Sequence, residues 1–116
     1  MAHAYISGTG FYVPPKVVTN DELVEKYGIG TSNEWIVQRT GIEARRFAEE
    51  GVGTAELGEH AARKALEAAG IEATELDMIL FATLSPDYAF PGSGVLLQRR
   101  LRAFRLATHL ALQRFQ

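Results

Sequence analysis

Trp35 and Arg39 are the residues whose types and spacing best suit ligand chemistry. On a helix, residues four apart share a face, so the indole and the guanidinium can stack on each other or flank one ligand. Arginine presents a fork of donors that suits phosphate, and tryptophan offers a planar surface for a base. Thr31 would add a hydroxyl at the helix N-terminus, where the first amides also favour an anion. Thr31, Trp35 and Arg39 therefore predict a site for an adenine-plus-phosphate ligand such as coenzyme A.

The same spacing also has a purely structural interpretation. Trp35 would then lie in the core, with the stem of Arg39 passing along it to place its charge in water. From spacing alone this second arrangement is the more common one, so both interpretations stay open at the level of sequence.

Other patterns that could carry chemistry are weaker. Gly8-Thr9-Gly10 follows an expected strand, but Val13 occupies the third glycine position of a dinucleotide-binding turn and two prolines follow it. Ser93 lacks a full nucleophile elbow and is expected to cap a helix. The histidines have no metal-ligand spacing, so we expect no metal site and no covalently bound cofactor; they are His3, His60 and His109.

Composition narrows the function classes further. The chain has 116 residues, a formal charge of -2 and 47% hydrophobic residues, as a soluble globular domain would, and one compact domain is expected. Without cysteine it has no disulfide, no thiolate metal site and no thiol nucleophile. No targeting or membrane segment is evident, so a cytoplasmic protein is expected. All 14 acidic residues lie in 1–87, whereas 88–116 holds five arginines and no acid.

Local signals predict alternating strands and helices, and hence an α/β layered fold. The box Thr19-Asn-Asp-Glu22 opens a helix through about Tyr27, and Thr31-Ser-Asn-Glu34 repeats the box before a helix over 33–40. A stripe of small apolar residues predicts a helix over 54–69. Strands are expected over 4–7, over 44–48, and over 77–83, where a continuous apolar run predicts burial on both faces. A last helix should start near Gly94 and reach Leu101 or continue beyond it.

Longer motifs carry a family resemblance. Thr31-Ser-Asn-Glu-Trp-Ile-Val-Gln-Arg-Thr-Gly-Ile42 resembles the T-S-D-E-W-I-x-x-R-T-G-I motif of the ketoacyl-acyl-carrier-protein synthase III family, in the thiolase superfamily. The opening Gly8-Thr-Gly10, the helix sequence from Ala61 to Ile71, and Asp87-Tyr-Ala-Phe-Pro91 are similar to the same family. The resemblance covers roughly residues 3 to 101.

The resemblance implies a thiolase-like layered α/β/α fold, of which this chain would hold the N-terminal part of the first half only. Family members form homodimers and load an acyl group from acyl-CoA, their substrate, onto a cysteine before condensing it with malonyl-acyl carrier protein. Residues matching Thr31, Trp35 and Arg39 contact coenzyme A. The residue matching Phe90 lines the acyl pocket, reaching across from the partner subunit.

The chain departs from the family pattern after Leu101. There the family continues with glycine and a strand leading to its nucleophilic cysteine, whereas this chain has no cysteine. We therefore expect residues 1–101 to form a partial N-terminal thiolase-like domain, and 102–116 to be a non-family basic tail, helical or irregular. Either the tail follows an altered reading frame or it is a real basic helix, and its acid-free composition favours the first.

The resulting hypothesis is an N-terminal fragment of a synthase III-like acyltransferase of fatty-acid or related biosynthesis. The fragment itself is expected to be inactive, because the catalytic Cys, His and Asn are absent. The alternative is a non-catalytic coenzyme A-binding or dimerisation module. The tail arginines could attract nucleic acid or an anionic membrane. No interleaved aromatic residues support that, so neither partner is expected.

Overall fold

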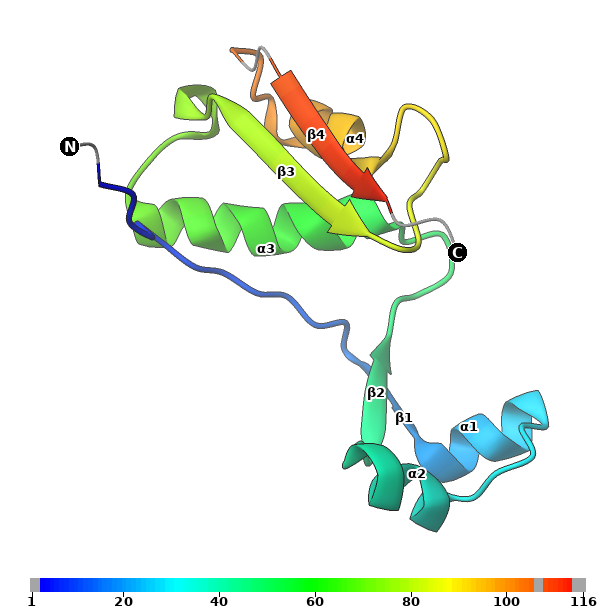
Figure 1. Ribbon diagram of the computed structural model, residues 1–116. Helices are drawn as coiled ribbons and strands as arrows, with labels where there is room; N and C mark the ends of the chain where they lie inside the picture. The colour runs from blue at the N-terminus through cyan, green and yellow to red at the C-terminus, as the bar shows by residue number, and fades with distance from the viewer. Residues whose placement is uncertain (1–2, 106–107, 114–116) are drawn as a thin grey trace. The chain divides into compact units, whose positions relative to one another are not determined.

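The computed structural model describes residues 3–105 and 108–113, with side chains over 3–105. The chain divides into two compact units rather than the single domain expected: unit 1 is Met1–Tyr12 with Val52–Gln116, and unit 2 is Val13–Gly51. Unit 2 is thus inserted into the chain of unit 1. Both units contain helices and strands, which confirms the predicted α/β class (Figure 1).

Unit 2 is a two-stranded hairpin carrying two short helices. β1 (Lys16–Thr19) pairs antiparallel with β2 (Ala44–Phe47), with Lys16 opposite Phe47 and Thr19 opposite Ala44. The helices α1 (Asn20–Tyr27) and α2 (Asn33–Thr40) lie between these strands in the chain. The expected strand near 44–48 is confirmed. Its partner β1 was not predicted, because two prolines precede it and indicated a loop.

Local capping explains both helices of unit 2. The Thr19 hydroxyl accepts from the Glu22 amide at 3.2 Å and the Glu22 carboxylate accepts from the Thr19 amide at 2.8 Å, so the predicted capping box is present. The second box differs from expectation, since Ser32 rather than Thr31 caps α2 by accepting from the Trp35 amide at 3.3 Å. α2 ends at Gly41, whose φ of 70° is readily adopted by glycine.

Unit 1 is built on α3 (Thr54–Ala69), whose bounds agree with the sequence prediction. Its small residues let two other parts of unit 1 pack closely against the helix, namely β3 and the segment 3–12. Gly58 faces Phe81, so that a Cβ there would meet the ring at 3.0 Å. Gly8 and Gly10 lie against the α3 backbone, and a Cβ on Gly8 would come within 2.5 Å of the Ala65 carbonyl.

The strand expected over 4–7 is wrong. Residues 3–12 form no regular strand and run as an extended segment beside α3 (Figure 1). The glycines of this segment pack directly on a helix, so its contacts are with the alanines of α3 and not with a sheet ladder.

The sheet of unit 1 is a parallel pair. β3 (Met78–Thr83) pairs with β4 (Thr108–Gln113), Met78 opposite Thr108 and Thr83 opposite Gln113. Ile79 belongs to the buried core, with Leu66 of α3 packed against it, whereas Met78 and Leu80 are exposed. The expected burial of β3 on both faces is therefore wrong among the described residues, because α3 and α4 both pack on the Ile79 face.

The predicted tail also differs from the structure. α4 (Ser93–Leu101) ends at Arg102, which adopts a left-handed φ of 57°, and the Ala103 amide then donates to the Gln98 carbonyl at 3.1 Å. The expectation that 102–116 is helical or irregular is wrong for Thr108–Gln113, which forms β4. The free edge of β3 offers a hydrogen-bond ladder that a continued helix would leave unused. A 3-10 turn, Ala73–Glu75, connects α3 to β3. Among the described residues no helix has the length and apolarity needed to cross a membrane.

Candidate functional site

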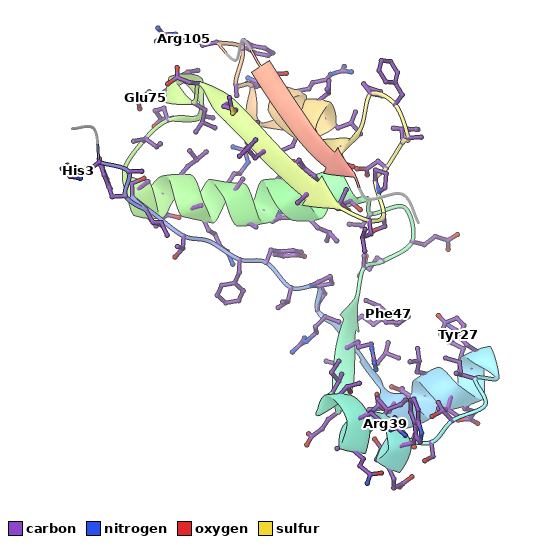
Figure 2. All side chains as sticks on the ribbon, in the orientation of Figure 1. His3, Tyr27, Arg39, Phe47, Glu75 and Arg105 are labelled. Atoms are coloured by element: carbon purple, nitrogen blue, oxygen red, sulfur yellow. The ribbon has the colours of Figure 1, made fainter. Side chains whose placement is uncertain are left out.

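Trp35 and Arg39 form a stacked pair on the surface of unit 2. The guanidinium carbon of Arg39 lies 5.2 Å from the centroid of the Trp35 ring, within the range of a cation–π interaction. Trp35 exposes 52% of its surface, so the interpretation of a core tryptophan is wrong. The predicted shared face is confirmed, and Figure 2 shows Arg39 on α2.

Thr31 lies beside this pair. Gly30, Thr31, Ser32 and Trp35 line an open depression of about 570 Å³. The Thr31 hydroxyl is buried and has no hydrogen-bond partner among the described residues. Buried polar atoms in native structures are generally hydrogen-bonded, so an orphan hydroxyl beside a depression indicates a group available to a ligand.

The first turn of α2 is less suited to an anion than the sequence indicates. The backbone amide of Glu34 and then the Ser32 hydroxyl hold the pKa of the Glu34 carboxyl below its ordinary value. A carboxylate that is ionised at neutral pH thus occupies the helix N-terminus, and Ser32 takes the Trp35 amide. The positive charge of Arg39, at the other end of α2, is therefore the better position for a phosphate.

The C-terminal end of α2 is held by its own residues. The Thr40 hydroxyl donates to the Ile36 carbonyl at 2.7 Å and accepts from the Ile42 amide at 3.1 Å. Ile36 is the buried residue of this helix. Trp35 directly precedes Ile36, so its side chain lies about 100° around the helix from the buried residue, and it is exposed.

Asn20, which no sequence pattern singled out, is fully buried. Its side-chain nitrogen donates to the Asn33 side-chain oxygen at 3.0 Å and to the Ile42 carbonyl at 2.7 Å. Its oxygen accepts from the Arg45 guanidinium at 2.7 Å. The only local signal was an asparagine directly after the Thr19 cap, and nothing near it indicates partners 13 to 25 residues away.

Phe90 lies in unit 1, on the loop between β3 and α4, and exposes 90% of its surface. The loop is anchored at Asp87, whose carboxylate accepts from the Ala55 amide at 2.9 Å and the Ser93 hydroxyl at 2.6 Å. Gly92, not Ser93, is the N-cap of α4, so the expected capping role of Ser93 is wrong. Trp35 lies with Thr31 in the lining of the depression and stacks with Arg39, which is not part of that lining. All three belong to unit 2, whereas Phe90 belongs to unit 1.

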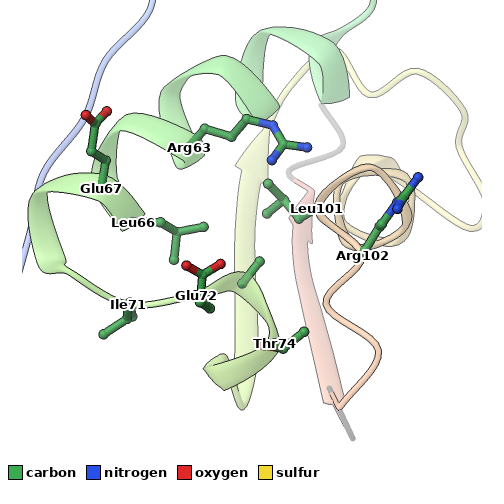
Figure 3. Close-up of a pocket in the computed structure, with 9 residues that line it drawn as sticks. Arg63, Leu66, Glu67, Ile71, Glu72, Thr74, Leu101 and Arg102 are labelled. Carbon is green, nitrogen blue, oxygen red and sulfur yellow. The ribbon is translucent and has the colours of Figure 1, made fainter.

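A second pocket, of about 490 Å³, lies between the C-terminal parts of α3 and α4 (Figure 3). Leu66, Ile71 and Leu101 contribute apolar walls. On its rim, the Arg63 guanidinium donates to the Glu59 carboxylate at 2.7 Å and to the Arg100 carbonyl at 3.1 Å. Arg63 of α3 is therefore hydrogen-bonded to the backbone of α4 at the rim of the pocket.

Solved structures define the class of protein. The chain matches 3-oxoacyl-[acyl-carrier-protein] synthase III from Aquifex aeolicus with a TM-score of 0.81 and 38% identity, covering 94% of this chain and 34% of that one. It matches the priming β-ketosynthase of the R1128 polyketide biosynthetic pathway with a TM-score of 0.82 and 32% identity, covering 94% and 32%. The thiolase-like α/β fold expected from the resemblance is thus confirmed.

Sequence relatives define the family. The chain is 49% identical over 106 residues to β-ketoacyl-[acyl-carrier-protein] synthase III of Bordetella petrii, covering 89% of this chain and 32% of the relative. It is 50% identical over 101 residues to the same enzyme of Laribacter hongkongensis, covering 87% and 31%. Over these residues the chain belongs to the β-ketoacyl-[acyl-carrier-protein] synthase III family, and it spans about a third of the length of these relatives. No family model matches it.

Proposed function

We propose that Thr31, Trp35 and Arg39 bind the adenine and a phosphate of coenzyme A. The observation that carries this proposal is the Arg39 guanidinium 5.2 Å from an exposed Trp35 ring. An exposed ring offers a stacking face to a base, and the adjacent guanidinium offers paired donors to a phosphate. The orphan hydroxyl of Thr31 adds a hydrogen bond at the edge of the same depression.

For the full-length form we propose the activity by which its relatives are named. It would take an acyl group from acyl-CoA and condense it, with loss of carbon dioxide, with malonyl-acyl carrier protein, in the cytoplasm and as a homodimer. The identities of 49% and 50% to synthase III enzymes support fatty-acid biosynthesis. The polyketide priming synthase among the similar structures supports a related pathway as the second candidate.

In this proposal the 116-residue chain is a binding module without condensing activity of its own. A covalent acyl-enzyme of this family requires a thiolate, and the sequence contains no cysteine. Incubation with radiolabelled acyl-CoA should leave no label on the denatured protein. Label that survives denaturation and is released by hydroxylamine would contradict this part of the proposal.

Calorimetric titration of coenzyme A tests the site directly. We expect the wild-type chain to bind coenzyme A more tightly than 4′-phosphopantetheine, which lacks the adenine. Trp35→Ala should lower the affinity for coenzyme A about tenfold, because a base-stacking contact contributes about 1–3 kcal/mol. Equal affinities of wild type and Trp35→Ala would remove Trp35 from the site.

Tyr27 provides a matched control on α1, where Figure 2 labels it. It is also 52% exposed and has a cation, the Lys26 ammonium, 5.4 Å from its ring centroid. It is absent from the lining of the depression at Thr31. Tyr27→Ala should therefore leave the coenzyme A affinity within about twofold of wild type.

Phe90 supports a separate part of the proposal, a contact in the acyl pocket of a partner subunit. Its 90% exposure on an anchored loop suits a side chain that inserts into another protein surface. Sedimentation at increasing concentration should show weaker self-association for Phe90→Ala than for wild type. Phe104→Ala, which removes another exposed ring of unit 1, is the control, and equal effects of the two changes would argue against a specific Phe90 contact.

A further inference from the structure

Asn20 holds both ends of the helix that carries the candidate site. Its side-chain nitrogen reaches Asn33, the first residue of α2, at 3.0 Å, and the carbonyl of Ile42, just past the end of α2, at 2.7 Å. Its own amide donates to the Glu43 carbonyl at 3.3 Å. One buried residue at the start of α1 therefore contacts both the first residue of α2 and the chain that follows this helix.

The partners of Asn20 require an amide at this position. The Arg45 guanidinium can only donate, so the atom facing it at 2.7 Å must be an acceptor. The Ile42 carbonyl can only accept, so the atom facing it must be a donor. Asparagine supplies both, and these two partners also settle which end of its amide is oxygen. Aspartate would retain the contact with Arg45 and place an acceptor against the Ile42 carbonyl.

α2 depends on such contacts for its position. A helix of eight residues has little stability of its own, and tertiary contacts must hold it. Ile36 is the buried side chain of α2. Its apolar contact stabilises the helix but is non-directional, so it does not by itself fix the rotation of the helix about its axis. The hydrogen bonds of Asn20 at both ends of α2 add the directional constraint that sets the rotation of the helix.

We propose that Asn20 is a positioning residue, which places Trp35 and Arg39 for the adenine and phosphate of coenzyme A. This inference rests on the proposed function for the identity of the ligand. Asn20 would act only through α2, since its own side chain is fully buried and its bonds go to protein groups.

Trp35 gives a test that needs no ligand, because it is the only tryptophan in the chain. In Asn20→Asp the two donated bonds are lost, and we expect the Trp35 emission maximum and its acrylamide quenching constant to change by more than the error of repeat measurements. Arg46→Met is the matched control in unit 2. It removes the guanidinium bond to the Pro15 carbonyl at 3.0 Å, which does not involve α2, and should leave Trp35 fluorescence unchanged.

Coenzyme A binding provides the second arm. Asn20→Asp should weaken coenzyme A binding about tenfold in calorimetry, and Arg46→Met less than twofold. In a Trp35→Ala background, Asn20→Asp should add less than about threefold, because only Arg39 is then left to be displaced. A purely structural role would give the same loss in both backgrounds, and that outcome would overturn the inference.

The two arms separate the inference from the proposed function. If the wild-type chain binds no coenzyme A, the proposed function fails, and the fluorescence comparison alone decides whether Asn20 positions α2. If coenzyme A binds and Asn20→Asp changes neither fluorescence nor affinity, the positioning role is wrong. Should Asn20→Asp lose its far-ultraviolet helical signal, Asn33→Ala replaces it. That change removes one of the bonds to α2, and an unchanged Trp35 signal there would overturn the inference.

Discussion

The Ser93 hydroxyl donates to the Asp87 carboxylate at 2.6 Å and accepts from the Asp87 amide at 2.9 Å. Ser93 is 1% exposed, so this pair closes the loop that carries Phe90 with hydrogen bonds shielded from water. The same carboxylate accepts from the Ala55 amide at the start of α3. Two residues thus tie the beginning of α3, the loop and the beginning of α4 into one cluster.

Ser93→Ala should lower the stability of unit 1 by about 1–3 kcal/mol, because it leaves a carboxylate in this cluster short of one donor. Since Trp35 reports on unit 2, amide hydrogen exchange in β3 and α4 is the suitable measurement. Ser85→Ala removes an exposed hydroxyl from the same loop and is the control. Equal exchange protection in wild type and Ser93→Ala would contradict the prediction.

Arg102→Gly should stabilise unit 1. Arg102 ends α4 with a φ of 57°, a conformation that costs a residue with a Cβ roughly 1–2 kcal/mol and glycine almost nothing. After the entropy that glycine adds to the unfolded chain, a net gain of about 0.5–1 kcal/mol remains. Thermal unfolding followed by circular dichroism measures it.

Arg99→Gly is the matched comparison on the same helix. Arg99 lies inside α4, where glycine costs about 1 kcal/mol, so the two substitutions should change stability in opposite directions. The same sign for both would mean that the left-handed turn after α4 is not strained.

Gly10→Ala should destabilise unit 1 by about 1–3 kcal/mol, because the added methyl group would overlap the α3 backbone at Ala61 and Ala65. Gly30→Ala is the control, since a methyl group on Gly30 would have no heavy atom within 4 Å. Denaturant unfolding of both variants gives the comparison. A Gly10→Ala change as mild as Gly30→Ala would show that residues 3–12 do not pack closely on α3.

Acid should weaken the contact between α3 and α4. The hydrogen bond from Arg63 is the main cause that holds the pKa of Glu59 below its ordinary value, and the bond from Arg100 adds to it. The Glu59 carboxylate in turn raises the pKa of Arg100. Because the folded pKa of Glu59 lies below its unfolded value, its contribution is present above the unfolded pKa and is lost as pH falls through the folded pKa.

Glu59→Gln should therefore flatten the dependence of stability on pH in the acidic range. Solvent screens these ion pairs, so the difference should be at most about 1 kcal/mol and should shrink in high salt. Glu67→Gln on the same helix is the control, since Glu67 forms no ion pair within the described part of the chain. Parallel pH profiles for wild type and Glu59→Gln would contradict the assignment.

The helices were predictable because their signals are local. The Thr19 box, the glycines after each of the first three helices and the alanine stripe of α3 mark element bounds within a few residues of sequence. Strand pairing is not local. Nothing near Lys16 indicates a partner at Phe47, and nothing near Thr108 indicates that it will lie opposite Met78. Of the two expected ends of the last helix, at Leu101 or beyond it, the structure has the first. The sequence could not decide between them, because a left-handed arginine ends α4 without any glycine or proline.

The site shows the same division. Helical spacing predicted the pairing of Trp35 with Arg39, which is a property of one turn of helix. Spacing could not predict that Trp35 is exposed, since exposure depends on which face Ile36 buries. The hydrogen bonds of Asn20 could not be predicted from local sequence, because its partner Arg45 lies 25 residues away.

The insertion of Val13–Gly51 within unit 1 has a consequence for the order of folding. Unit 2 is closed by its own hairpin, whose register brings Lys16 opposite Phe47, so its contacts span short lengths of chain. The packing of Gly10 on α3, by contrast, requires closure across the whole insert. If the hairpin forms first, the loop between Gly10 and α3 is reduced to the few residues outside the paired ends Lys16 and Phe47. The entropic cost of closing this loop is then lower. Early folding of unit 2 would then make it easier for residues 3–12 to pack against α3.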